Sequence, residues 1–344
     1  MPRLRVGVIF GGRSEEHAVS LQSAAEVLSA LDPERFDVVL MGITREGKFL
    51  AGPGSLEALA GSSAPAALAP TTELAPAARR LGVDVVFPIL HGPYGEDGTV
   101  QGLLELMDVP YVGSGVLGSA AAMDKGVMKA LFRDAGLPVV PSRVVAAPEL
   151  ADPGLPRALV EELGLPLFVK PCNLGSSVGI RKVVREADLG EALACASRHD
   201  RRLIVERGVV ARELECGVLG NDRLEASVVG EVIPDGEFYD YAAKYERDSK
   251  LVIPASIPED VARRARELAL AAARAVDAQG LARVDFFLVG SELFVNEINT
   301  IPGFTRRSMF PRLWERSGIP YPALCERLID LALDRHRRRA HQEG

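Results

Sequence analysis

Two stretches near the C-terminal end of the chain carry charged side chains at alternating positions. Arg283 and Asp285 lie in one expected strand, and Glu297 and Asn299 lie at the end of the next. Residues two apart on a strand share a sheet face, so each pair points to one side. Carboxylate and amide oxygens at this spacing suit one or two Mg²⁺ ions that bridge phosphates. The alternative is a solvated strand face of mixed charge.

Both pairs share one face only if the loop between the strands has an odd number of residues. We therefore predict the three-residue loop 290–292, which places Asp285 opposite Glu297 and Arg283 opposite Asn299. A two-residue loop would put Asp285 and Glu297 on opposite faces of the sheet and would argue against the metal site.

A second candidate site is the segment 170–179, with the sequence KPCNLGSSVG. An expected strand delivers Lys170, and the loop that follows offers small residues, free backbone N–H groups and the hydroxyls of Ser176 and Ser177. Such a loop can bind phosphate groups next to the positive charge of Lys170. A plain glycine hairpin is the alternative. The chain contains no G-x-x-x-x-G-K-[ST] loop.

The segment 113–118 matches the G-x-G-x-x-G pattern of dinucleotide-binding proteins. In those proteins the pattern follows the first strand, and an acidic residue closes a second strand about 20 residues later. Here it follows the fourth expected strand, and the residues about 20 further on, 134–138, lie beside a helix end. This context disfavours a nicotinamide site and a dehydrogenase.

Two further clusters carry suitable side chains. Glu16 begins a helix that we expect Ser14 to cap, and its carboxylate would lie over the carboxyl ends of the sheet, where ligands of open α/β sheets bind. An acid at a helix N-terminus is also an ordinary partner of the helix dipole. The loop 238–245 is rich in tyrosine, as loops that act as lids can be.

Alternating strands and helices in the first part of the chain must position these residues. This alternation predicts a parallel α/β sheet. We expect a variable loop over 51–72, a small α+β unit from about Pro138, and a third block with a helix at 258–277. The expected strands are 6–10, 36–43, 83–90, 110–113, 139–145, 166–170, 179–184, 202–206, 213–219, 224–233, 282–289 and 293–298.

Composition excludes several classes of protein. The chain has 344 residues and a net charge of -7, which argues against a protein that mainly binds nucleic acid. Its four cysteines form no C-x-x-C pair, as expected for reduced thiols. No stretch resembles a signal peptide or a membrane span of about 20 apolar residues, so we expect a cytoplasmic protein with no membrane partner. The basic run 335–339 suits a solvated helix end better than a nucleic-acid arm.

Taken in order, six sequence strings resemble the D-alanine–D-alanine ligase family of the ATP-grasp superfamily. Any one of them is modest support, whereas six in the family's order are highly specific. The strings are 11–17 (GGRSEEH), 91–99 (HGPYGEDGT), 123–125 (MDK), 170–179, 239–245 (YDYAAKY) and 297–305 (EINTIPGFT).

The resemblance implies an ATP-grasp fold preceded by an N-terminal parallel α/β, Rossmann-like domain. The implied division is 1–123 for the N-terminal domain, 124–212 for the central lid domain and 213–344 for the C-terminal domain. It also implies ATP and two Mg²⁺ ions, for which Mn²⁺ can substitute. The implied ATP-binding residues are Lys125, Lys170, Ser176, Ser177, Glu206, Glu213 and Lys244, and the metal ligands are Asp285, Glu297 and Asn299.

The implied reaction phosphorylates the carboxylate of one D-alanine and joins it to the amine of a second. Glu16 would hold the first ammonium, with His91 nearby, although a core histidine is the alternative for His91. Arg283 and the N–H of Gly303 would stabilise the tetrahedral oxyanion. Ser308 would hold the second carboxylate. A hydrogen-bond chain through Glu16, Ser176 and Tyr245 is our hypothesis for deprotonating the incoming ammonium.

Some alternatives stay open on sequence grounds. A sister ligase would make D-alanyl-D-lactate or D-alanyl-D-serine, although Tyr245 after Lys244 favours the dipeptide by resemblance. A nucleotide-binding regulator without chemistry would not need the complete set of site residues. The chain departs from the family at Ala18 and at 306–307, beside the second-substrate pocket. The resemblance implies a homodimer formed through the N-terminal domain.

Overall fold

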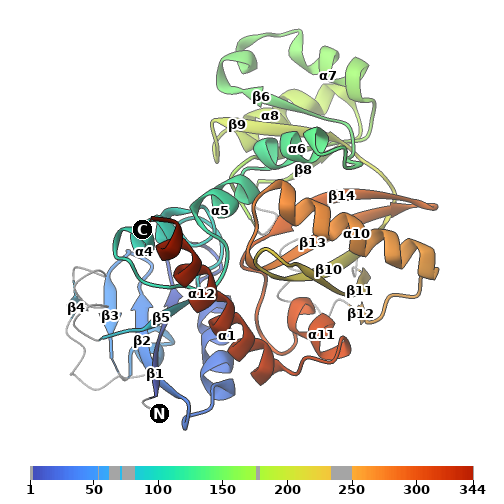
Figure 1. The fold of residues 1–344 in the computed structure, drawn as a ribbon. Coiled ribbons are helices and arrows are strands. Elements are labelled where there is room, and N and C mark those ends of the chain that lie inside the picture. The colour runs from blue at the N-terminus through green and yellow to red at the C-terminus, as the bar shows by residue number, and fades with distance from the viewer. Residues whose placement is uncertain are drawn as a thin grey trace.

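The computed structural model describes residues 3–52, 54–61, 70–71, 82–175, 179–233 and 250–343, and three β-sheets follow one another along this chain (Figure 1). Each sheet lies within one of the three implied domains, except that the first strand of the third sheet begins at Arg212. The domain boundaries themselves stay a prediction.

The first sheet has the strand order β4-β3-β2-β1-β5. Strands β1, β2 and β5 are parallel, as predicted, and β3 and β4 add an antiparallel edge. Helices α1 and α12 pack on one face of the sheet, and α4 packs on the other. The elements are β1 (Leu4–Gly11), α1 (His17–Ala30), β2 (Phe36–Ile43), β3 (Phe49–Ala51), α2 (Ser55–Leu59), β4 (Pro70–Thr71), β5 (Val85–Ile89), α4 (Thr99–Leu106) and α5 (Val116–Met123).

Two expectations for this region are wrong. The segment 51–72 is not a loop throughout, because it contains the end of β3, all of α2 and β4. Residues 110–113 form no fourth strand, since their only pairing is an isolated parallel bridge between Val86 and Tyr111. Gly113 adopts a φ of +101°, a left-handed conformation that leaves the extended path of a strand.

The second sheet has the order β6-β9-β7-β8, and its neighbouring strands pair in antiparallel fashion. Helices α7 and α8 supply the leucines that cover it, and these pack with β7 and β9 in one buried cluster. The elements here are α6 (Lys125–Asp134), β6 (Ser142–Ala146), α7 (Leu155–Leu163), β7 (Leu167–Pro171), β8 (Arg181–Val183), α8 (Leu189–Ala196) and β9 (Arg202–Arg207).

The third sheet is antiparallel, with the order β12-β11-β10-β13-β14. Helix α10 covers one face together with α6, and α11 packs against β10 and β11. The elements are β10 (Arg212–Gly220), β11 (Glu225–Ile233), β12 (Lys250–Val252), α10 (Glu259–Ala275), β13 (Gly280–Val289), β14 (Glu292–Asn299), α11 (Met309–Arg316) and α12 (Tyr321–Glu343).

The C-terminal helix α12 returns to the first sheet (Figure 1). Its apolar residues Leu324, Leu328 and Ile329 are fully buried in a cluster that also contains Phe87 of β5 and Leu281 of β13. The first and third sheets therefore share one hydrophobic core, and this burial stabilises their relative position. Among the described residues, no helix is long and apolar enough to cross a bilayer.

Candidate active site

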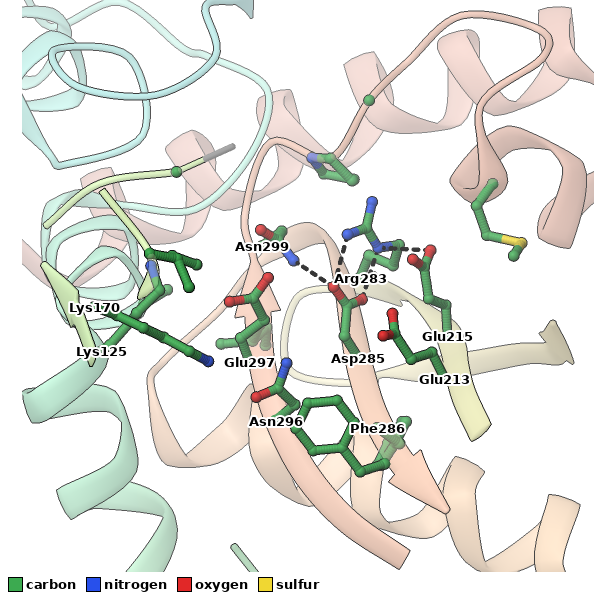
Figure 2. A pocket seen from close by; sticks show the side chains of 18 of the residues that line it. Lys125, Lys170, Glu213, Glu215, Arg283, Asp285, Phe286, Asn296, Glu297 and Asn299 are labelled. Carbon is green, nitrogen blue, oxygen red and sulfur yellow. Dashed lines mark hydrogen bonds and ion pairs between the residues drawn. The ribbon is translucent and has the colours of Figure 1, made fainter. Parts of the chain in front are cut away.

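A cavity of about 630 Å³ is lined by residues that lead from all three sheets. Glu16 and His91 line it from the first sheet, Lys170 from the second, and Asp285 and Glu297 from the third. The structure thus brings together predicted site residues that are almost 300 positions apart. Figure 2 shows the charged side chains of the second and third sheets converging on this space.

Strands β13 and β14 present the predicted acidic pair. Asp285 lies opposite Glu297 and Arg283 lies opposite Asn299, as predicted. The predicted loop 290–292 is wrong, however, because Val289 pairs with Glu292 across a two-residue turn.

A β-bulge explains why the side-chain pairing survives the shorter loop. Phe286 pairs with Val295 while Asp285 pairs with Glu297, so Asn296 is an extra residue in β14. One extra residue reverses the alternation of side chains along the strand beyond it. Glu297 therefore returns to the face of Asp285, and Asn296 itself lines the cavity.

Arg283 joins two carboxylates on this face. Its Nε lies 2.7 Å from Asp285 Oδ1 and 2.8 Å from Glu215 Oε2, and its Nη2 lies 2.7 Å from Asp285 Oδ2. Asn299 Nδ2 donates to Asp285 Oδ2 at 3.1 Å. The Arg283 side chain is only 13% exposed, and these bonds hold its guanidinium in one orientation toward the cavity.

The oxygen donors on this face fit Mg²⁺. Within the described ranges no three His, Cys, Asp or Glu side chains form a cluster that could hold a metal by themselves. Mg²⁺ is usually held by one or two carboxylates together with substrate phosphates and water, so Asp285, Glu297 and Asn299 are a suitable partial set. Asp285 keeps lone pairs for a metal even while it accepts from Arg283, because a carboxylate has about four acceptor positions.

A buried ion-pair triad borders the cavity through Lys170 and Glu206. The Glu206 carboxylate is 2.7 Å from Lys129 Nζ and 2.5 Å from Lys170 Nζ. Burial opposes ionisation of Glu206, but the two ammonium groups outweigh it and lower its pKa to about 2. Burial lowers the pKa of Lys129. Burial also acts to lower the pKa of Lys170, but the charge and hydrogen bond of Glu206, together with the charges of Glu297 and Glu213, outweigh it and raise that pKa. Glu206 therefore holds Lys170 charged at the cavity wall.

Lys125 is positioned by the start of α6. Asp124 is the N-cap of this helix, and its Oδ1 accepts from Val127 N at 2.9 Å. Lys125 Nζ donates to the carbonyl of Leu174 at 2.6 Å, which joins the helix to the glycine-rich loop. Lys125 and Lys170 thus line the same cavity from two elements.

Glu16, His91 and Glu96 lie together where the first sheet meets the cavity. Burial lowers the pKa of His91, and its Nδ1 bonds the Ile301 carbonyl at 3.0 Å, so the ring is neutral with Nδ1 as donor. No described residue forms a hydrogen bond with the buried Nε2. Burial and the nearby Glu16 charge raise the pKa of Glu96 to about 8.

Ser14 does not cap helix α1 as expected. The N-cap of α1 is Glu16, and Ser14 Oγ instead donates to the carbonyl of His91 at 2.7 Å. This bond joins the loop after β1 to the loop after β5. His91 is buried and also lines the cavity, so its position fits both the core and the site interpretation.

The loop from Gly303 to Ser308 closes another side of the cavity. Ser308 Oγ lies 2.8 Å from Thr305 Oγ1 and accepts from Thr305 N at 3.2 Å. Ser308 is also the N-cap of α11. The guanidinium of Arg306 lies 4.7 Å from the centre of the Tyr321 ring, whereas Arg307 lines the cavity. Only the second of the two unusual arginines therefore borders the site.

Four of the predicted site residues lie outside the described residues: Ser176, Ser177, Lys244 and Tyr245. The predicted ATP-binding residue Glu213 lines the cavity. Sequence reasoning missed Lys129, Glu215, Glu96 and Asn296. The i+4 spacing of Lys129 from Lys125 and the i+2 spacing of Glu215 from Glu213 were available signals. No sequence signal indicated the bulge that places Asn296 in the cavity wall.

Lysines and carboxylates line one cavity, and the two antiparallel sheets follow a first sheet with three parallel strands. This fold and site define an ATP-grasp enzyme of the carboxylate–amine ligase class. A family model described as the D-ala D-ala ligase C-terminus matches residues 131–330, and one described as the D-ala D-ala ligase N-terminus matches residues 5–114. The chain belongs to the D-alanine–D-alanine ligase family.

Individual relatives agree with this assignment. D-alanine--D-alanine ligase of Geobacillus thermodenitrificans is 48% identical, covering 97% of this chain and 96% of the relative. The Solibacter usitatus ligase is 47% identical, covering 98% of both chains. The solved Coxiella burnetii D-alanine-D-alanine ligase has a TM-score of 0.84 at 33% identity and covers 99% and 97% of the two chains. VanG D-Ala:D-Ser ligase of Enterococcus faecalis has a TM-score of 0.86 at 36% identity and covers 96% and 100%.

Proposed function

We propose that this chain joins two D-alanines into D-alanyl-D-alanine with the conversion of ATP to ADP and phosphate, for peptidoglycan precursor synthesis. The relatives cited above carry this activity in their names. The observation that carries the proposal is that Glu16 and His91 line the same cavity as Arg283, Asp285 and Glu297. A carboxylate that can bind the ammonium of D-alanine and cations that can bind the phosphates of ATP are thereby held around one space.

In the first step, a carboxylate oxygen of D-alanine attacks the γ-phosphorus of ATP, and ADP leaves. Glu16 holds the ammonium of this D-alanine, and the neutral His91 lies beside it. Lys125 and Lys170 neutralise phosphate charge, since phosphoryl transfer mainly requires positioning and charge neutralisation. Asp285, Glu297 and Asn299 would hold Mg²⁺, or Mn²⁺ in its place, which would supply further charge neutralisation.

In the second step, the amine of the second D-alanine attacks the carbonyl carbon of the acyl phosphate, and phosphate leaves. Arg283 and the N–H of Gly303 stabilise the oxyanion of the tetrahedral intermediate. Support comes from the ion pairs that hold Arg283 at 13% exposure, because a fixed donor needs little reorganisation during the reaction.

Ser308 and the N-terminus of α11 hold the carboxylate of the second D-alanine. An unpaired N–H group at a helix start favours an anion, and Ser308 is the N-cap of α11. Arg307 adds a positive charge at this side of the cavity. A hydrogen-bond chain through Glu16, Ser176 and Tyr245 deprotonates the incoming amine. The residues Ser177, Lys244, Glu206 and Glu213 bind ATP.

The proposal extends to the setting of the enzyme: a cytoplasmic homodimer, formed through the N-terminal domain, that acts on small molecules and has no nucleic-acid or membrane partner. The resemblance to VanG gives D-serine as an alternative second substrate, and D-lactate is a further one.

Product analysis with mixed acceptors tests the proposal. The enzyme is given ATP and Mg²⁺ with D-alanine alone, with L-alanine, or with D-alanine plus D-serine or D-lactate, and the products are analysed by mass. We expect one phosphate for each D-alanyl-D-alanine and none with L-alanine. A mixed product as the main species would replace the proposal with the sister ligase, and ATP binding without hydrolysis would contradict both.

A further inference from the structure

The glycine-rich segment 113–118 packs tightly against residues 277–280, which lead into β13. A Cβ on Gly118 would lie 2.4 Å from the Asp277 carbonyl oxygen, and a Cβ on Gly280 would lie 3.1 Å from the backbone of Gly113. Gly113 and Gly280 also adopt φ values of +101° and +72°. Close backbone contact, not a dinucleotide, therefore accounts for these glycines.

Hydrogen bonds join the same two segments. Ser114 Oγ accepts from the Gln279 N–H at 3.0 Å and lies 3.2 Å from the Gln279 carbonyl, to which it donates. Ser114 is only 2% exposed, so these bonds are shielded from water. The contact thus combines steric fit with satisfied buried polar groups.

Arg335 of α12 closes this contact from a third element. Its Nη2 donates to the Tyr111 carbonyl at 3.0 Å, its Nη1 donates to the Gly113 carbonyl, and its guanidinium lies 4.3 Å from the centre of the Tyr111 ring. We call residues 111–118, 277–280 and Arg335 the interdomain joint. Lysine would not replace Arg335 there, because only the planar guanidinium can reach two carbonyls and stack on a ring.

The interdomain joint lies close in sequence to both halves of the active site. Gly280 begins β13, three residues before Arg283. On the other side, Tyr111 bridges to Val86 of β5, the strand that leads to His91. A displacement of one segment against the other would therefore move His91 and Glu16 relative to Arg283 and Asp285.

We propose that the interdomain joint sets the distance between the first-substrate residues and the oxyanion and metal residues, with Arg335 as a positioning residue. This inference rests on the proposed function, because it assigns the first D-alanine to Glu16 and His91. The residues assigned to ATP that the structure describes lie on α6 and on strands of the second and third sheets, so we expect ATP binding not to depend on the interdomain joint. They are Lys125, Lys170, Glu206 and Glu213.

The test compares Arg335→Met with Arg335→Lys and with Arg337→Ala, an exposed arginine on the same helix. A misplacement of about 1 Å can cost roughly 100-fold in rate, so kcat/KM for the first D-alanine should fall about 10- to 100-fold in both Arg335 variants. The Kd for ATP should stay within about twofold of the wild type in both. Equal losses in ATP affinity and in D-alanine kcat/KM would indicate general destabilisation and would overturn the proposal, as would unchanged kinetics.

A glycine pair provides a second test that does not involve Arg335. Gly280→Ala introduces a Cβ against Gly113, whereas Gly136→Ala, at φ +69°, meets nothing within 4 Å. Both variants carry the strain of a positive φ, but only Gly280→Ala should lower kcat/KM for the first D-alanine. Hydrogen exchange supplies a readout apart from activity: the Gln279 N–H should lose protection in Gly280→Ala and in Arg335→Met and keep it in Gly136→Ala. Equal behaviour of the two glycine variants would overturn the proposal.

Failure of this inference can be told apart from failure of the proposed function by Glu16→Gln in the wild-type background. If Glu16→Gln leaves the KM for the first D-alanine unchanged, the proposed role of Glu16 is wrong whatever the Arg335 variants do. If Glu16→Gln raises that KM and the Arg335 variants do not, the interdomain joint alone is wrong.

Discussion

Asp285 lies directly opposite Glu297 across strands β13 and β14, although only two residues connect these strands. The extra residue Asn296 makes this possible, because it shifts the alternation of β14 by one position. The bulge therefore places both proposed metal-binding carboxylates on the cavity side of the sheet. The extra residue Asn296 itself also lines the cavity.

Glu297→Ala should abolish ligation, whereas Asn296→Ala and deletion of Asn296 should retain it. Without the extra residue, Glu297 follows Val295 in a regular ladder and still lies opposite Asp285, whereas loss of a metal-site group costs about 100-fold or more in activity. Steady-state phosphate release at saturating Mg²⁺ measures all three variants. Equal losses from Glu297→Ala and from the deletion would contradict the proposed role of the Glu297 carboxylate.

Glu206→Gln should destabilise the protein strongly. Removal of one partner from a buried ion pair costs about 3–5 kcal/mol, and here Lys129 is left without its carboxylate. Glu162→Gln is the control, because its pair with Arg143 is half exposed and contributes less than about 1 kcal/mol. Urea unfolding at neutral pH measures both free energies. Equal losses in the two variants would contradict the assigned importance of the Glu206 triad.

Glu96 should make the fold less stable as pH rises. Its pKa is about 8 in the folded state against 4.5 for a free carboxyl group, so the folded state binds a proton that the unfolded state has lost. Its stabilising contribution is complete below pH 4.5 and is lost as pH rises to about 8. The unfolding free energy of Glu96→Gln should not share this decline. Parallel curves for wild type and variant between these pH values would argue against the raised pKa.

The two arginines that depart from the family should behave differently. Arg307→Ala should raise the KM for the second D-alanine about two- to fivefold, the effect of losing one exposed charge interaction. Arg306→Ala should leave that KM unchanged, since Arg306 packs on Tyr321. The Arg307 effect should shrink at high salt because exposed charges are screened. A larger change from Arg306→Ala would reverse this assignment.

Sequence patterns predicted the elements where hydrophobic spacing is strong. Strand β2 was predicted to the residue at Phe36–Ile43, and the pairing of Asp285 with Glu297 was predicted correctly. The loop that was expected to produce this pairing was wrong, because nothing in the residue types of β14 marks a bulge at Asn296. The pattern of residue types within a strand predicts which side chains alternate between the two faces, but it does not predict an extra residue in the pairing of two strands.

Long-range contacts account for the other errors. Ser14 has the side chain of a helix cap, yet a carbonyl 77 residues away accepts its hydrogen bond. Gly113 and Gly118 resembled a nucleotide-binding pattern, yet they contact 277–280. Lys129 was missed because its carboxylate partner lies on another element. Such partners depend on how the elements pack, which the spacing within one segment does not specify.

The central claim is that ATP activates the carboxylate of the first D-alanine in the cavity between Glu16 and Asp285. The most direct measurement uses D-alanine with ¹⁸O in its carboxylate and determines the mass of the released phosphate. In the proposed reaction the oxygen that attacks the γ-phosphorus stays with that phosphorus when phosphate leaves. Each phosphate should therefore carry one ¹⁸O, accompanied by ADP. Unlabelled phosphate, or AMP with pyrophosphate, would contradict the account.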